Sequence, residues 1–230
     1  MRRTTAILAT VLAVAGATVS NAEDHFTHDQ PGHLQTGSGS GVTDGKIYLP
    51  GILFPIEKAP AFANSQVYGH GGVNGPGGGQ CDKANYSYPW RDTFCEKRSR
   101  STPMCPGGTG HQGQDIRPAT CQAERYWTVA VEDGVITNVG TYSVSLLGDS
   151  GTLYRYLHIQ MNDLNVGELQ RVTKGEHIGK VSNSFGGTPT TIHLHFESKR
   201  TVSINGKSLN TFVPPYSSLV AAYEKLPGVQ

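Results

Sequence analysis

The chain has 230 residues, of which 19 are Lys or Arg and 18 are Asp or Glu. This near balance excludes a strongly basic nucleic-acid-binding protein and an electrostatic attachment to anionic lipids. The 29 glycines and 13 prolines, with only short apolar runs between them, are typical of an all-β domain with long surface loops.

The first 22 residues have the pattern of a secretory signal peptide. A basic start at Arg2 and Arg3 precedes a short apolar run at residues 6–19, and small residues lead up to a cleavage site after Ala22. The run is too short for a comfortable membrane span, which leaves an uncleaved anchor as the less favoured alternative. We therefore expect an exported protein, periplasmic or secreted, with no integral membrane span after cleavage.

Residues 23–50 are polar and rich in Gly and Ser, with too little apolar content to fold alone. They are interpreted as a leader or linker before one domain at residues 51–230. The histidines of this leader, His25, His28 and His33, match no compact ligand set. A solvated linker is therefore favoured over a weak surface metal site.

The cysteines fall within about forty residues: Cys81, Cys95, Cys105 and Cys121. An even number in an exported chain predicts two disulfides, and the absence of a close Cys-x-x-Cys pair argues against a zinc knot. Three pairings are open, and the expected one joins nearest neighbours, Cys81 to Cys95 and Cys105 to Cys121. Three of the cysteines lie in a long irregular insertion at about residues 69–110, and loops of this length tend to be functional.

Beyond the insertion, short alternating runs predict strands at residues 126–131, 135–139, 141–147 and 152–159. Turn residues at 132–134 and 148–151 mark reversals, so consecutive hairpins and an antiparallel sheet are expected. Residues 166–181 have a loop-and-strand pattern in which His177 is assigned to a turn. Helical spacing at residues 216–226, stopped by Pro227, predicts a short C-terminal helix. The predicted fold is mainly β, an antiparallel sheet or sandwich.

Residues 190–198 form a β-branched and aromatic run with strict alternation, which predicts a strand with positions 192, 194 and 196 facing a core. His193, His195 and Glu197 then share the other face. Two histidines at i and i+2 lie roughly 7 Å apart along a strand, close enough to reach one metal pocket. Ordinary alternation on a half-solvated strand is the competing interpretation.

Two further segments carry candidate site residues. His111 and Asp115 are four apart, and the glycines around them and Pro118 favour a strand, on which an even spacing keeps both on one face. His158 ends another strand, on the face shared by Tyr154 and Tyr156. A buried, hydrogen-bonded role for this histidine is the alternative to a catalytic one.

A hydrolytic zinc site commonly has three His or carboxylate ligands and one open position for water. His111, Asp115 and His195 supply that set, and His158 and His193 remain as nearby bases. Three possible ligands and two possible bases are the number of groups that a hydrolytic metal site requires.

The order of these motifs is specific. His111-x-x-x-Asp115, then Tyr156-x-His158, then His193-x-His195 followed by Phe-Glu, resembles the lysostaphin/LytM-type zinc metallopeptidases, which cut peptidoglycan peptides. The resemblance extends over about residues 54–216, interrupted by the insertion. It implies the lysostaphin-type fold and an endopeptidase with one Zn²⁺ per chain. It further implies that His111, Asp115 and His195 bind the zinc.

By the same resemblance, His158 and His193 act on the water and the oxyanion, in an order that the sequence leaves open. Tyr154 or Tyr156 is a candidate to assist the oxyanion, with packing as the alternative role. The expected substrate is peptidoglycan stem or cross-bridge peptides, and a monomer is expected. Departures from the family pattern at residues 182–192 and in the long insertion border the expected groove and concern which bond is cut.

Two other functions stay open at this point. A non-catalytic wall-binding or regulatory module could keep the same residues by descent, and a zinc peptidase could act on glycine-rich proteins. A further hypothesis is that residues 23–50 cover the groove and hold the enzyme latent.

Overall fold

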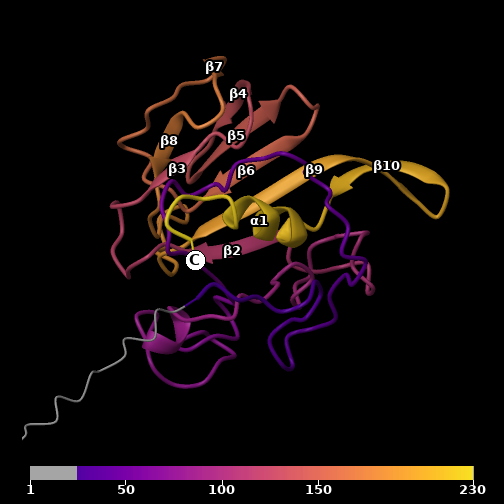
Figure 1. The fold of residues 1–230 in the computed structure, drawn as a ribbon, viewed down its shortest axis with the longest axis vertical. Coiled ribbons are helices and arrows are strands. Elements are labelled where there is room, and N and C mark those ends of the chain that lie inside the picture. Colours follow the sequence, from indigo (N-terminus) through magenta and orange to yellow (C-terminus); the bar gives the residue numbers. More distant parts are fainter. Residues whose placement is uncertain (1–24, 230) are drawn as a thin grey trace, which may run out of the picture.

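The computed structural model describes residues 25–229, so the predicted signal peptide at residues 1–22 lies outside the described part. The main sheet is antiparallel, with strand order β1-β2-β9-β6-β5-β4-β7 and with β10 paired to β9 (Figure 1). Its strands are β1 (Phe62–Ala63), β2 (Gly113–Arg117), β4 (Gly134–Val139), β5 (Ser143–Gly148), β6 (Leu153–Leu157), β7 (Arg171–Val172), β9 (Leu194–Ile204) and β10 (Lys207–Phe212). The mainly β, antiparallel prediction is confirmed.

Three shorter elements complete the described chain: a two-stranded sheet of β3 (Trp127–Val129) and β8 (His177–Lys180), a 3₁₀ turn (Lys83–Asn85) and the helix α1 (Tyr216–Tyr223). The C-terminal helix was predicted, and it ends three residues earlier than expected. None of the helices in residues 25–229 is long and apolar enough to cross a membrane.

One face of the main sheet packs on the hydrophobic core. Alternate residues of neighbouring strands supply it, including Ile116, Tyr156 and Phe196, all with 0% exposure. The helix α1 lies across this face in Figure 1, and its Leu219 and Tyr223 join the same cluster. Fully burying such side chains stabilises the fold by about 1.5–3 kcal/mol each.

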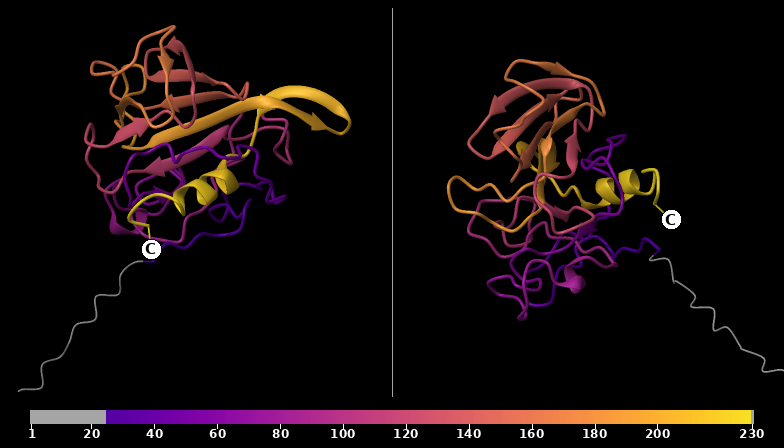
Figure 2. Two further views of the ribbon diagram at one scale, coloured as in Figure 1. Left: turned by 45° about the horizontal axis from the view of Figure 1, so that its top comes forward. Right: turned by 90° about the vertical axis from the view of Figure 1, so that its left-hand side faces the viewer.

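The strand β9 crosses from the core into solvent. Its first five residues are buried and the remainder are half-buried or exposed, because residues 200–204 pair only with β10. This hairpin projects from the body of the molecule (Figure 2). The buried first half is the part that carries His195, so the site lies where the sheet is covered on both faces.

Two predictions of local pairing are wrong. The turn at residues 132–134 does not join a hairpin, because β3 pairs with β8 in the second sheet while β4 pairs with β5 and β7. His177 begins β8 instead of lying in a turn, and its ring stacks on Trp127 at 4.6 Å between centroids. The pairing partner of a short strand is a long-range choice, which a local pattern does not specify.

The disulfide pairing also differs from the prediction. Cys81 joins Cys121, and Cys95 joins Cys105. The first bond ties the insertion to the segment after β2, and the second closes a tight loop inside the insertion. Sequence neighbours were expected to pair, but the cysteines that meet are those that the folded backbone brings to a Cα separation of 5.4 Å.

The described part of the leader is packed, which contradicts a solvated linker. The backbone N–H of Asp29 donates to the carbonyl of Trp90, and the N–H of Trp90 donates to the carbonyl of Thr27. Phe26 packs edge-on to the Trp90 ring at 4.8 Å between centroids. The polar leader is ordered because the rest of the fold supplies the partners that its own composition lacks.

Candidate metal and catalytic site

The register between β2 and β9 builds the centre of the site. Asp115 lies directly opposite His195, and Gly113 lies opposite Glu197, so these side chains project from the same face of the sheet. His111 lies two residues before β2, and His193 immediately precedes β9. Two sequence motifs 80 residues apart are thereby brought onto one surface.

Three donor atoms converge at this point. His111 Nε2 lies 3.4 Å from Asp115 Oδ1, and His195 Nδ1 lies 2.8 Å from the same oxygen. One ligand atom from each of the three residues lies within 4.8 Å of the others. A tetrahedral ion with bonds of about 2 Å separates its ligands by about 3.3 Å, so these two imidazoles and one carboxylate fit the donor set of zinc.

Four histidines lie at the site, and three of them present Nε2 to it because a backbone carbonyl accepts a hydrogen bond from the other ring nitrogen, Nδ1. A carbonyl can only accept, so Nδ1 carries the proton in each. The bonds are His111 to Thr93 at 2.9 Å, His193 to Thr191 at 2.8 Å and His158 to Ser184 at 2.8 Å. Each ring is fixed in orientation and tautomer before any ligand is present.

His195 is turned the other way. Its Nδ1 faces Asp115, and its Nε2 donates to Glu197 Oε1 at 2.9 Å. Glu197 in turn accepts from Arg155 on β6, which lies directly opposite it in the sheet. A histidine that binds metal characteristically donates its second N–H to a carboxylate or carbonyl, and Glu197 takes that place here.

Burial and charge set the protonation of these groups. Burial acts to raise the pKa of Asp115, but His111 and His193 outweigh it and hold that pKa well below its usual range. Burial lowers the pKa of His111 and, together with the neighbouring His193, lowers the pKa of His158 to about 3. His158 is therefore neutral at physiological pH. Despite its burial, hydrogen bonds to Asp115 and Glu197 raise the pKa of His195 to about 9.

A cavity of about 220 Å³ opens onto these groups. Its lining includes all five predicted site residues: His111, Asp115, His158, His193 and His195. The His158 and His193 rings lie 4.6 Å apart between centroids, and His158 lies 6.2 Å from His195. The structure thus brings these five residues together around one cavity.

Residues 109–211, which hold the donor set and His158 and His193, match the model of peptidase family M23. The match covers a little less than half of the chain, and it contains every residue of the candidate site. The comparison with curated protein sequences found no match.

Among solved structures, a LytM protein from Ruminococcus gnavus is 18% identical, with 75% of this chain and 61% of that chain covered and a TM-score of 0.47. The catalytic domain of the antimicrobial peptidase lysostaphin from Staphylococcus simulans is 20% identical, with 56% and 90% covered and a TM-score of 0.42. The present chain thus spans less than two thirds of the Ruminococcus gnavus protein.

His158 is placed in the site by an irregular backbone. Strand alternation predicted that His158 would share a face with Tyr154 and Tyr156, but both tyrosines are buried in the core and neither lines the cavity. His158 has a φ of 64°, in the left-handed region, and this turn directs its ring to the opposite face. Packing is therefore the role of the two tyrosines. The left-handed residue leaves no signal in the sequence.

Gly113 allows the close approach of β2 to His195. A Cβ at this position would lie 2.4 Å from the Phe196 carbonyl oxygen and 2.9 Å from His195 Nε2. Any larger residue would displace the ring that faces Asp115. The glycine between the two residues of the His-x-x-x-Asp motif thus has a steric reason.

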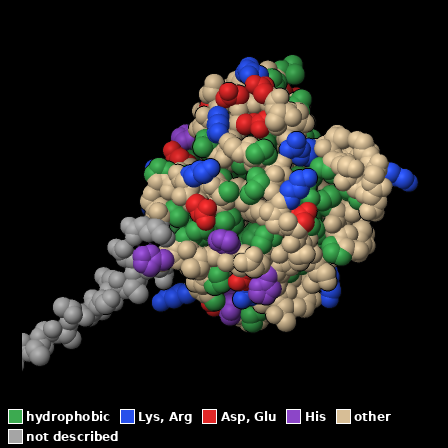
Figure 3. Space-filling model, turned by 45° about the vertical axis from the view of Figure 1, so that its right-hand side comes forward, with side chains coloured by type: hydrophobic (Ala, Val, Ile, Leu, Met, Phe, Trp, Pro, Cys, Tyr) green, Lys and Arg blue, Asp and Glu red, His purple; other side chains and the backbone are tan. Residues whose placement is uncertain are grey.

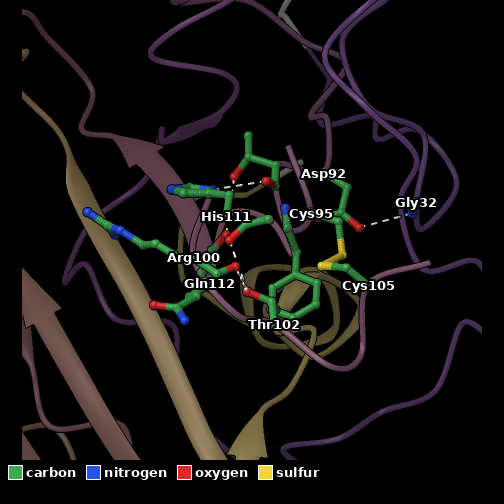
Figure 4. Close-up of a disulfide and its surroundings, with 12 residues drawn as sticks. Gly32, Asp92, Cys95, Arg100, Thr102, Cys105, His111 and Gln112 are labelled. Atoms are coloured by element: carbon green, nitrogen blue, oxygen red, sulfur yellow. Dashed lines mark hydrogen bonds between the residues drawn. A yellow bond between two sulfur atoms is a disulfide. The ribbon is translucent and has the colours of Figure 1, made fainter. Parts of the chain in front are cut away.

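Other residues that the sequence did not suggest also line the cavity. Arg98 and Arg100 of the insertion line the cavity, as do Gln66, which lies just before the insertion, and Phe185 from the loop that departs from the family pattern. In Figure 4, the side chains of His111 and Arg100 extend in the same direction, away from the disulfide between Cys95 and Cys105. The two arginines come close to His111 only through the fold of a 40-residue segment with little periodicity, so no local pattern in the sequence could have identified them as cavity residues.

Glu96, which belongs to the same insertion, is fully buried, and burial raises its pKa to about 8.

On the face of the molecule shown in Figure 3, Lys and Arg side chains are mixed with Asp and Glu, in keeping with the net charge of +1. Neither sign of charge dominates this face, so we expect charges close to the cavity to decide what the cavity attracts.

None of the residues that line the cavity comes from residues 25–50. The described leader instead packs around Trp90 and Asp92, where the Gly32 N–H donates to the Asp92 carboxylate at 2.9 Å. This placement gives no support to a leader that covers the groove.

Proposed function

We propose that the protein is an exported, zinc-dependent endopeptidase that hydrolyses peptide bonds in peptidoglycan stem or cross-bridge peptides. One Zn²⁺ per chain would be held by His111, Asp115 and His195. The observation that carries the proposal is the convergence of these donor atoms, with two further imidazoles, on one cavity in an M23 domain.

Zinc bound there would polarise the scissile carbonyl and lower the pKa of water to about 7. The chain's own groups supply the proton transfers. His158 is neutral, and its Nδ1 is committed to Ser184, so Nε2 is free to accept a proton from the attacking water. His193 presents Nε2 on the other side, 3.5 Å from Asp115 Oδ1. Because its Nδ1 proton is committed to the Thr191 carbonyl, His193 would donate from Nε2 to the developing oxyanion in its doubly protonated form.

Export is supported by the sequence at residues 1–22 and by the two disulfides, which persist in oxidising compartments. Expression of the full gene product, followed by N-terminal sequencing of the protein outside the cytoplasm, should give a chain that begins at Glu23. Recovery of an unprocessed chain in the cytoplasm would contradict export.

Digestion of purified peptidoglycan tests the activity. The zinc-loaded protein should release new amine termini, a chelator should stop the release, and added zinc should restore it. His195→Ala should lose both zinc and activity, whereas His158→Ala should keep the zinc and lose activity by about 10²-fold or more. Mass spectrometry of the products identifies the bond.

The same experiment separates the alternatives. Binding to the wall without new amine termini, even with zinc supplied, would indicate a non-catalytic module. Cleavage of a glycine-rich protein with no cleavage of peptidoglycan would indicate a protein-directed peptidase. Full activity of His195→Ala would refute the proposed metal site.

A further inference from the structure

The loop closed by the Cys95–Cys105 disulfide is joined directly to the proposed metal site. The N–H of Cys95 donates to the carbonyl of His111 at 3.0 Å, and the N–H of His111 donates to the carbonyl of Glu96 at 2.9 Å. Further along the loop, the Gly110 N–H donates to the Arg100 carbonyl at 2.9 Å. The loop therefore cannot move far without moving His111.

Two arginines on this loop, Arg98 and Arg100, line the cavity. Among residues 25–229, the only carboxylate in the cavity lining is that of Asp115, which is already surrounded by three imidazoles. The apolar lining residues are Val67, Leu157 and Phe185. The space beside the proposed zinc ligands thus combines two guanidinium groups with apolar side chains, and the described residues that line it include no carboxylate besides Asp115.

The two guanidinium groups are differently held. Arg98 donates to the Lys97 carbonyl at 2.8 Å and lies 3.4 Å from Glu96 Oε2, so part of its donor set is fixed by the buried acid. Arg100 has no hydrogen bond or ion pair through its guanidinium with any residue from 25 to 229; only its backbone carbonyl is engaged. Figure 4 shows this side chain extended alongside His111. Arg100 is available to a ligand.

We propose that Arg98 and Arg100 bind a free carboxylate of the substrate close to the scissile bond, so that the enzyme selects acidic peptides. This inference rests on the proposed peptidase function and adds its substrate class. A guanidinium fork matches a carboxylate with two parallel hydrogen bonds, and such charge-assisted bonds are stronger than neutral ones. The apolar residues accommodate an uncharged part of the same substrate.

The test uses the full zinc-loaded protein and two forms of one material. Purified peptidoglycan is compared with the same peptidoglycan after its free carboxylates have been converted to amides with carbodiimide and ammonia. Wild type should release amine termini about tenfold faster from the acidic form. Once the cleaved bond is known, a pair of synthetic peptides, acid and amide, gives kcat/KM for each.

Arg100→Gln should lose about tenfold in kcat/KM on the acidic peptide and keep its rate on the amide, with zinc content unchanged. Arg100→Lys should retain part of the preference, because it keeps the charge without the fork. Lys97→Gln is the matched control: it removes a charge from the same loop, but Lys97 points away to the Gly37 carbonyl and should leave the preference intact.

The outcomes are distinguishable. Equal wild-type rates on the two forms, or an unchanged preference in both Arg100→Gln and the double variant with Arg98→Gln, would overturn the carboxylate site and leave the peptidase function standing. An equal loss on acid and amide peptides in Arg100→Gln would also overturn it, since that pattern indicates a general defect. Cleavage of neither form would refute the proposed function itself.

Discussion

Substitution of Glu197 tests whether its carboxylate orients His195, one of the proposed zinc ligands. It is 1% exposed, accepts from His195 Nε2 and is paired with Arg155 across β6 and β9. Glu197→Gln keeps the shape and one acceptor but removes the charge, and Glu197→Ala removes both. Loss of such an orienting partner typically lowers metal affinity 10- to 100-fold, or about 1.4–2.7 kcal/mol.

We expect about tenfold weaker zinc binding for Glu197→Gln and about 100-fold for Glu197→Ala. The side chain of Arg155 is 32% exposed, so water can solvate it when its partner is lost, and the metal-free fold should remain intact. The measurement is a competition titration against a chelator of known affinity at fixed pH, with circular dichroism as the check on folding.

Glu132→Gln is the control, because Glu132 accepts from Tyr154 and Ser150 far from the donor set. It should bind zinc as tightly as wild type. Wild-type affinity in both Glu197 variants, with the fold preserved, would refute the view that this carboxylate orients His195.

Further predictions concern protons, sterics and the leader. Because the raised pKa of His195, about 9, leaves it protonated in the metal-free protein below that pH, zinc must displace one proton; apparent affinity should rise about tenfold per unit between pH 6.5 and 8, and a pH-independent affinity would contradict this. Gly113→Ala should lower zinc content and the thermal midpoint, whereas Gly107→Ala, whose Cβ would meet nothing within 4 Å, should change neither. Removing residues 23–50 should destabilise the protein by about 3 kcal/mol or more, because the buried Leu34 and Leu49 are lost, and a chain activated by this truncation would contradict the packing described.

The order of chemistry-bearing residues was accessible from the sequence. The His-x-x-x-Asp spacing and the His-x-His alternation each keep their members on one strand face, because side-chain direction on a strand repeats every two residues. Together with the resemblance that they support, these local patterns predicted the residues that meet at the cavity, the antiparallel strands around them and the C-terminal helix.

The environment of these residues was decided by the tertiary structure. The left-handed backbone at His158 reverses the face that alternation predicts, and the register of β6 with β9 sets Arg155 against Glu197. The disulfides and the loop with Arg100 depend on which distant segments meet. Sequence periodicity is a property of neighbours along the chain, whereas pairing, ring orientation and the charge lining a cavity are set by contacts between segments tens of residues apart.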